Sequence, residues 1–160
     1  MKTCVHALAF GAVLALGVPI MSLSAQAADP AAGTWELNVA KSTFSPGPAP
    51  KSLTRTFEVN GTDVKYSAKG VDAAGKPTLM EYTAKYDGKD YPVAGSPDFD
   101  TISLKQVDPA TSVATLKKSG KLVQTTTRVV SKDGKTLTLT VKGKNAKGQA
   151  VNNVMVFDKQ

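Results

Sequence analysis

Short turns centred on glycine recur along most of this chain, and they constrain its fold more strongly than any other feature. Glycine supplies the positive φ angle that tight hairpin turns require, and a preceding Asn or Asp tolerates the same backbone conformation. The pattern predicts a series of antiparallel hairpins with turns at Asn60-Gly61, Ala74-Gly75-Lys76, Asp87-Gly88-Lys89, Ser119-Gly120-Lys121, Asp133-Gly134-Lys135 and Lys147-Gly148.

Between these turns, apolar and polar residues alternate with a period of two. In SLTRTFEV, for example, Leu53, Arg55 and Phe57 share one face of the segment, and mostly Thr and Glu occupy the other. Such alternation is typical of half-buried antiparallel strands. We expect ten strands, with ends uncertain by about two to four residues, at 33–39, 51–60, 63–69, 78–86, 89–93, 99–107, 111–118, 121–131, 135–143 and 150–158.

The pattern therefore predicts an all-β chain that forms a single antiparallel up-and-down meander barrel of about eight to ten strands. Closure removes exposed strand edges, and the short hairpin links suit a meander better than a β-sandwich, which is the alternative. One link is longer. The segment from Ala40 to Pro50 contains three prolines, so we expect it to cross one end of the barrel as an ordered loop.

The first 27 residues have the composition of a secretory signal peptide. Lys2 supplies a positive charge, residues 5–18 form an almost unbroken apolar run, and Ala25-Gln26-Ala27 places small residues where a signal peptidase reads. Cys4 lies far upstream of this cleavage point, so it is not a lipidated cysteine. We expect residues 1–27 to be removed, residues 28–160 to form one domain, and the product to be periplasmic or secreted.

Cleavage would also remove Cys4 and His6, the only cysteine and the only histidine of the chain. The remaining residues would form no disulfide, would lack Ser-His-Asp and Cys-His catalysis, and would offer poor ligands for a transition metal. No spacing singles out a carboxylate pair or a Ser-Lys dyad. We therefore expect no enzyme activity, no cofactor and no metal. A calcium site is a weaker alternative, because the spacing of the nearest acidic cluster does not match an EF-hand loop: Asp87, Asp90, Asp98 and Asp100.

The charge of the chain is unevenly distributed. The full sequence carries a net charge of +7, which becomes +6 once Lys2 is lost, and from Ala110 onward ten basic residues face only Asp133 and Asp158. This basic C-terminal part would favour weak contact with anionic surfaces of the cell envelope. The alternative is that its lysines simply occupy hairpin turns and solvated strand faces. Nucleic acid is not an expected partner, because no aromatic-basic stacking motif is present.

Gly33-Thr34-Trp35 on the first expected strand, followed by a meander, resembles the start of the lipocalin and fatty-acid-binding (calycin) barrels. The longer strings GTWELNVAKSTFSPGPAPKSLTRTFE, YTAKYDGKDYPVAGSPDFDT and TTTRVVSKDGKTLTL are also similar to small exported bacterial proteins of unassigned function. The resemblance implies a lipocalin-like barrel in which Trp35 lies at the closed end beneath a packed arginine. The chain departs from true lipocalins in lacking a disulfide, a Thr-Asp-Tyr type of motif and a helix after the strands.

Five residues are candidates for a ligand-binding site: Trp35, Arg55, Tyr66, Tyr82 and Arg128. The alternation places the first two inward. Trp35 shares a face with Leu37 and Val39, so it would either seal one end of the barrel or form a wall of a ligand cavity. Arg55 lies between apolar residues, where an unpaired charge is costly. It would either stack on Trp35, as the lipocalin pattern implies, or hold the carboxylate of a bound fatty acid or similar anion, which is the role of internal arginines in fatty-acid-binding barrels.

Arg128, the only other arginine, lies in a strand whose two faces are both mixed, so its direction stays open. Tyr66 and Tyr82 would pack in the core or offer hydroxyl groups to a ligand, and Tyr86 and Tyr91 are further core or rim aromatics.

Two functions follow from the sequence. The first is a monomeric carrier that binds an apolar or anionic amphipathic, lipid-like small molecule without catalysis. The second is a packed barrel that serves as a structural or protein-interaction module of the envelope and holds no ligand. Large inward side chains throughout would indicate the packed barrel, whereas small inward residues would leave room for a ligand.

Overall fold

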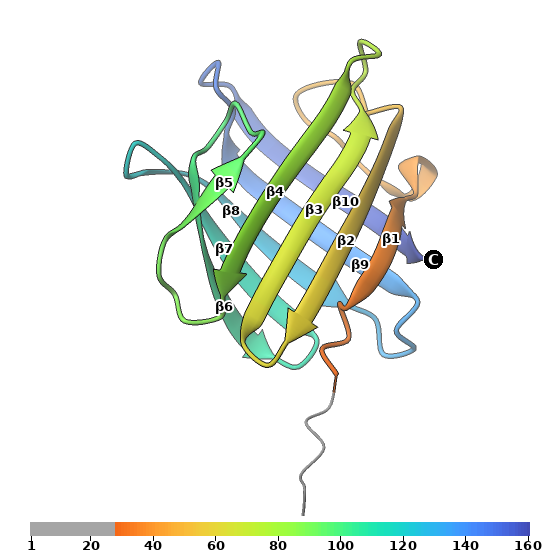
Figure 1. Cartoon of the computed structure of the whole chain (residues 1–160). Helices are drawn as coiled ribbons and strands as arrows, with labels where there is room; N and C mark the ends of the chain where they lie inside the picture. Colours follow the sequence, from red (N-terminus) through yellow and green to blue (C-terminus); the bar gives the residue numbers. More distant parts are fainter. Residues whose placement is uncertain (1–27) are drawn as a thin grey trace, which may run out of the picture.

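The computed structural model describes residues 28–160, and the expected signal peptide, residues 1–27, lies outside the described residues. The described chain is a closed antiparallel up-and-down barrel in which each strand pairs with its sequence neighbours and β1 pairs with β10 (Figure 1). The predicted fold class is thus confirmed. The ten strands are β1 (Gly33–Leu37), β2 (Ser52–Asn60), β3 (Asp63–Val71), β4 (Pro77–Lys85), β5 (Tyr91–Ala94), β6 (Thr101–Asp108), β7 (Thr111–Lys118), β8 (Lys121–Val130), β9 (Thr136–Lys144) and β10 (Ala150–Lys159).

The first strand is shorter than the alternation predicts. It ends at Leu37, because the Asn38 side chain accepts a hydrogen bond from the backbone N–H of Lys41 and caps a single 3₁₀ turn, η1 (Val39–Lys41). A short polar side chain that bonds its own backbone favours such a turn over a continuing strand. Within residues 28–160, no helix is long and apolar enough to cross a membrane.

The proline-rich link between β1 and β2 first follows β10 instead of crossing the end of the barrel at once. Thr43 forms a bridge with Val154, and the backbone N–H of Asn152 donates to the carbonyl oxygen of Ser45. The Ser45 N–H in turn donates to the side chain of Asn153. Through these contacts the link runs beside β10 to the end of the barrel where β2 begins.

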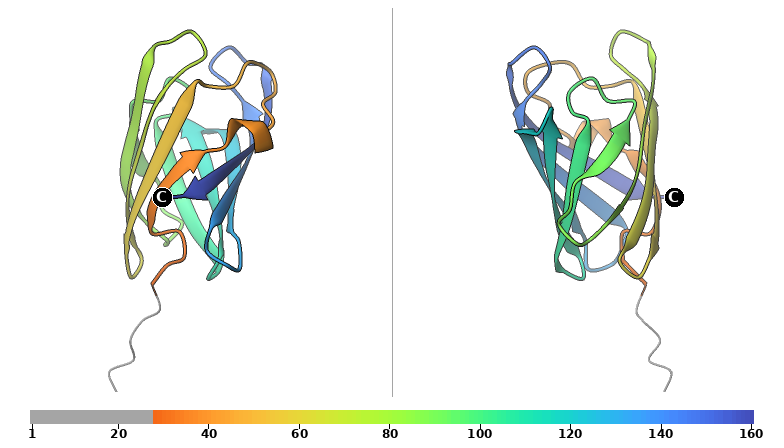
Figure 2. Two further views of the ribbon diagram at one scale, coloured as in Figure 1. Left: turned by 90° about the vertical axis from the view of Figure 1, so that its right-hand side faces the viewer. Right: turned by 60° about the vertical axis from the view of Figure 1, so that its left-hand side comes forward.

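Consecutive hairpins of a meander alternate between the two ends of the barrel, and this alternation defines two regions (Figure 2). We call the end that carries loops 72–76, 95–100, 119–120 and 145–149, together with the start of β2, the mouth. We call the opposite end, which carries loops 61–62, 86–90, 109–110 and 131–135 and the incoming residues 28–32, the closed end. The largest fully buried side chains all lie toward the closed end: Trp35, Phe157, Leu137 and Val64.

Gly33 is required where the chain enters β1. Its φ angle of +121° is one that residues with side chains rarely adopt. A Cβ atom placed there would lie 3.3 Å from Cε of Lys159. The glycine therefore leaves a path for the Lys159 side chain.

Candidate functional site

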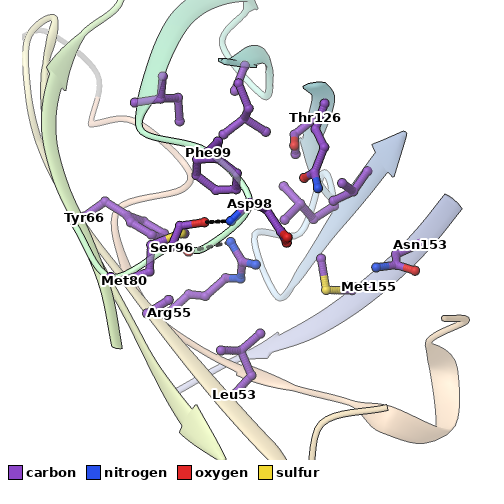
Figure 3. A pocket seen from close by; sticks show the side chains of 18 of the residues that line it. Leu53, Arg55, Tyr66, Met80, Ser96, Asp98, Phe99, Thr126, Asn153 and Met155 are labelled. Carbon is purple, nitrogen blue, oxygen red and sulfur yellow. Dashed lines mark hydrogen bonds between the residues drawn. The ribbon is translucent and has the colours of Figure 1, made fainter. Parts of the chain in front are cut away.

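A cavity of about 470 Å³ occupies the half of the barrel that opens at the mouth (Figure 3). Its size lies within the range of small-molecule binding sites, about 300–1,000 Å³. The wall is mainly apolar, with Leu53, Ala68, Met80, Phe99 and Met155 among its lining residues. Small and polar inward residues complete the wall and leave the space unfilled: Thr78, Ser96, Gln124, Thr126 and Asn153.

Arg55 points into this cavity, as the alternation in β2 predicted. Its guanidinium carbon lies 5.0 Å from the ring centre of Phe157 and 5.7 Å from that of Tyr66. One nitrogen, Nη1, donates a hydrogen bond to the Tyr66 hydroxyl, while Nε is buried and has no hydrogen-bond partner within residues 28–160. No carboxylate of the described residues lies within 4 Å of Arg55. The cavity therefore contains a guanidinium cation that has no carboxylate partner among residues 28–160. Its buried Nε–H group also forms no hydrogen bond there.

Arg128 also points inward, which resolves the direction that the sequence left open. It is only 5% exposed, and its Nη2 lies 3.5 Å from Oδ1 of Asp29, whose side chain is equally buried. The guanidinium also lies over the rings of Phe57, at 5.3 Å, and Tyr86, at 5.9 Å. Arg128 also lines the cavity, and its Nε and Nη2 have no hydrogen-bond partner within residues 28–160. It differs from Arg55 in that a carboxylate, Asp29, balances its charge.

Asp29 ties the incoming chain to the closed end of the barrel. One carboxylate oxygen accepts a hydrogen bond from the backbone N–H of Ala31, and the other accepts one from the Tyr86 hydroxyl at 3.1 Å. The indole N–H of Trp35 donates to the Ala31 carbonyl oxygen at 2.8 Å. Residues 28–32 thus close this end. No local sequence signal marks Asp29, because it precedes the first strand and its partners are far along the chain.

Trp35 is fully buried at 0% exposure, and it does not line the cavity. Of the two expected roles, it fills the closed end and forms no cavity wall. The expected stacking of Arg55 on Trp35 is wrong, although the two residues are register partners across β1 and β2. The cation over the indole is Lys159, 5.0 Å from the ring centre. Lys159 reaches the ring because Gly33 has no side chain in its path, whereas the Arg55 side chain extends toward the cavity.

Tyr66 and Tyr82 stack on each other along one cavity wall, with ring centres 4.5 Å apart. Burial raises the pKa of the Tyr66 phenol above its ordinary value, although the Arg55 charge acts in the opposite direction. Burial also raises the pKa of Tyr82, and the neighbouring Tyr66 phenol adds to the effect. Both phenols are therefore neutral at physiological pH.

The other two tyrosines and the acidic cluster lie elsewhere. Tyr86 bonds Asp29 at the closed end, and Tyr91 donates to Asp87 in the 86–90 loop. The four aspartates that suggested calcium separate, since Asp87 and Asp90 lie at the closed end and Asp98 and Asp100 at the mouth. Among residues 28–160, no three His, Cys, Asp or Glu side chains group closely enough to hold a metal ion.

A second aspartate that sequence analysis did not place at the site bridges the rim of the mouth. Oδ1 of Asp98 accepts a hydrogen bond of 2.7 Å from the backbone N–H of Ala146, so loop 95–100 is held against the hairpin 145–149. Figure 3 shows Asp98 and Ser96 among the residues that line the cavity. No local sequence signal connects Asp98 with Ala146, because the two residues are far apart in the chain.

No family model matches the chain, and no curated protein matches it. Among solved structures it is similar to zebrafish ileal bile acid-binding protein in complex with cholic acid, with 14% sequence identity and a TM-score of 0.49. The match covers 82% of this chain and 99% of that protein. At this level of similarity, the fold assignment rests on the strand topology of the chain itself.

Proposed function

We propose that this protein is a carrier that binds an anionic amphipathic small molecule in the cavity, with the anionic group on Arg55 and the apolar part along the cavity wall. The observation that carries the proposal is the Arg55 guanidinium, which lies in an apolar cavity with an unused buried donor and no carboxylate within 4 Å. An inward charge without a partner is costly, and an anionic ligand would supply the missing partner.

The filling of the barrel favours the carrier over the packed module. The inward residues are large toward the closed end and small or polar toward the mouth, where about 470 Å³ stays open. The proposal involves no chemical step, because residues 28–160 contain no His or Cys and burial keeps the Tyr66 and Tyr82 phenols protonated.

Export with cleavage after Ala27 is part of the proposal. Among residues 28–160, Asp29 lies just beyond that cleavage point and contacts Arg128 and Tyr86, so these contacts of the closed end would remain after cleavage. Intact-mass measurement on exported protein tests this. A retained N-terminus or an added diacylglyceryl mass would contradict it.

Titration with a fluorescent fatty acid and with its methyl ester tests the carrier directly. A charge-assisted hydrogen bond contributes about 1.5–3 kcal/mol, so Arg55→Gln should lower affinity for the acid about tenfold to a hundredfold. The ester carries no charge, and its weaker binding should change little. The urea unfolding curve of the variant serves as the folding control, and it should stay near that of the wild type.

Two results would contradict the proposal. If the wild-type protein binds neither probe, the cavity is not a lipid-like site. If Arg55→Gln weakens acid and ester equally, the guanidinium shapes the cavity but does not hold an anion.

A further inference from the structure

The lysines of the barrel are distributed unequally between its two ends. At the mouth they occupy the hairpin loops or the strand residues that border those loops, and one stands at the entry to β2. These mouth lysines are Lys51, Lys76, Lys118, Lys121, Lys144 and Lys147. All six are exposed, and none lies within 4 Å of a carboxylate of the described residues. The rim of the cavity is thus surrounded by cations that the fold does not use.

The carboxylates at the mouth offset only half of this charge, because three aspartates lie there beside the six lysines. Asp72, Asp98 and Asp100 each accept a hydrogen bond from a backbone N–H group, donated by Lys76, Ala146 and Ser119 respectively. They therefore serve to shape the loops. By contrast, two lysines at the closed end are paired with carboxylates, Lys85 with Asp63 and Lys89 with Asp87.

The closed end is balanced toward negative charge. The same definition of loops and bordering residues places six carboxylates and four lysines there: Asp29, Asp63, Asp87, Asp90, Asp108 and Asp133, with Lys85, Lys89, Lys132 and Lys135. Two of these carboxylates are paired with cations outside this set, Asp29 with Arg128 and Asp90 with Lys117. The molecule therefore has a positive end at the cavity opening and a neutral to negative end opposite. A charge distribution of this kind orients a protein toward an anionic surface.

Two exposed leucines lie at the same end as the free lysines. Leu79, near the start of β4, is 46% exposed, and Leu122, near the start of β8, is 61% exposed. The other large exposed apolar side chains of the described residues are valines. Lysines around exposed leucines are the combination that binds lipid headgroups and inserts a shallow apolar contact between them.

We infer that the mouth is a docking surface for an anionic lipid bilayer, with the mouth lysines on the phosphate headgroups and Leu79 and Leu122 at the headgroup boundary. This goes beyond the proposed carrier function and, apart from Leu79, uses residues that do not line the cavity. The surface overlaps the basic C-terminal part that the sequence suggested, with four lysines in common: Lys118, Lys121, Lys144 and Lys147. Lys132, Lys135 and Lys159 of that part lie at the closed end, while Lys51 and Lys76 join the mouth from the other half of the chain.

Vesicle co-sedimentation with matched variants tests the inference. The protein should bind vesicles of equal parts phosphatidylglycerol and phosphatidylcholine, and added salt should weaken the binding. The double variant Lys118→Gln/Lys121→Gln changes two exposed lysines that flank a mouth hairpin. The control Lys132→Gln/Lys135→Gln changes two exposed lysines that flank a closed-end hairpin, so both variants lose the same net charge.

A lysine near an anionic surface contributes about fivefold to partitioning, so the mouth pair should weaken vesicle binding about 25-fold. The control pair should change it little. Equal losses for the two pairs, or no binding of the wild type to anionic vesicles, would overturn the inference. So would equally strong binding to pure phosphatidylcholine.

Fluorescent labels at the two ends measure independently which end of the barrel faces the vesicle. An environment-sensitive fluorophore on Leu122→Cys should shift to shorter wavelength when anionic vesicles are added, while the same label on Val107→Cys should not. Val107 is a suitable control because it is also 61% exposed but lies near the closed end; both variants carry Cys4→Ser. A shift at Val107 alone would overturn the orientation. Both measurements are made without fatty-acid probe, so their outcome does not depend on the proposed ligand.

Discussion

The closed end and the mouth of this barrel are continuous along the same strands, yet their inward positions are filled in opposite ways. At the closed end, Trp35, Leu137 and Phe157 are fully buried, and Asp29 neutralises Arg128. Toward the mouth, Thr78, Thr126 and Ala68 leave a cavity, and Arg55 has no carboxylate partner. Dense packing and open space are therefore separated along the barrel axis. One end holds the fold together, and the other keeps an open, charged space.

Removal of the tryptophan at the closed end should have the largest effect on the free energy of unfolding. Trp35→Ala removes a fully buried indole and its hydrogen bond to Ala31, so we expect a loss of about 3–5 kcal/mol in the free energy of unfolding. Met80→Ala, on the partly buried cavity wall, should cost well under half of that, because it enlarges an existing space. Urea unfolding curves measure both. If both variants lose the same free energy of unfolding, the closed end and the cavity wall contribute equally to stability.

A smaller effect is expected from the buried ion pair. Asp29→Asn keeps the size of the side chain but leaves Arg128 without its counter-charge, which should destabilise the fold by about 3 kcal/mol. The second substitution Arg128→Met in the same chain should recover much of this loss, because no buried charge is then left. If the single variant unfolds at the wild-type urea concentration, Arg128 has another anion and the closed end does not depend on Asp29.

The smallest effect is expected at a partly exposed contact of the seam between β1 and β10. The Asn38 side chain donates a hydrogen bond to Asp158, which holds the pKa of that carboxyl below its ordinary value. A carboxyl with a lowered folded-state pKa stabilises the protein above its unfolded-state value, near about 3.9, and this contribution disappears as the pH falls through the lowered value. Asp158→Asn should therefore be slightly less stable than wild type at neutral pH and equal to it in acid. A difference that stays constant with pH would contradict this assignment.

Much of the architecture follows from local sequence alone. Glycine turns and two-residue alternation specify the strands, because hairpin geometry and side-chain direction depend on neighbours within a few residues. The same alternation places Arg55 inward, since it lies between Leu53 and Phe57. Arg128 could not be placed in this way, because both faces of its strand are mixed and only the barrel supplies its partner, Asp29.

Other properties were decided only by the tertiary structure. Lys159 covers Trp35 because barrel closure brings β10 beside β1, and no spacing in the sequence indicates a contact between opposite ends of the chain. The cavity depends on the summed volumes of inward residues from all around the barrel. The charge separation depends on topology: successive turns alternate ends, so the lysines near Gly75, Gly120 and Gly148 gather at the mouth, while Asp87 and Asp133 lie at the other end. The sequence determined which residues form turns and which face inward. Barrel closure decided which other residues they contact.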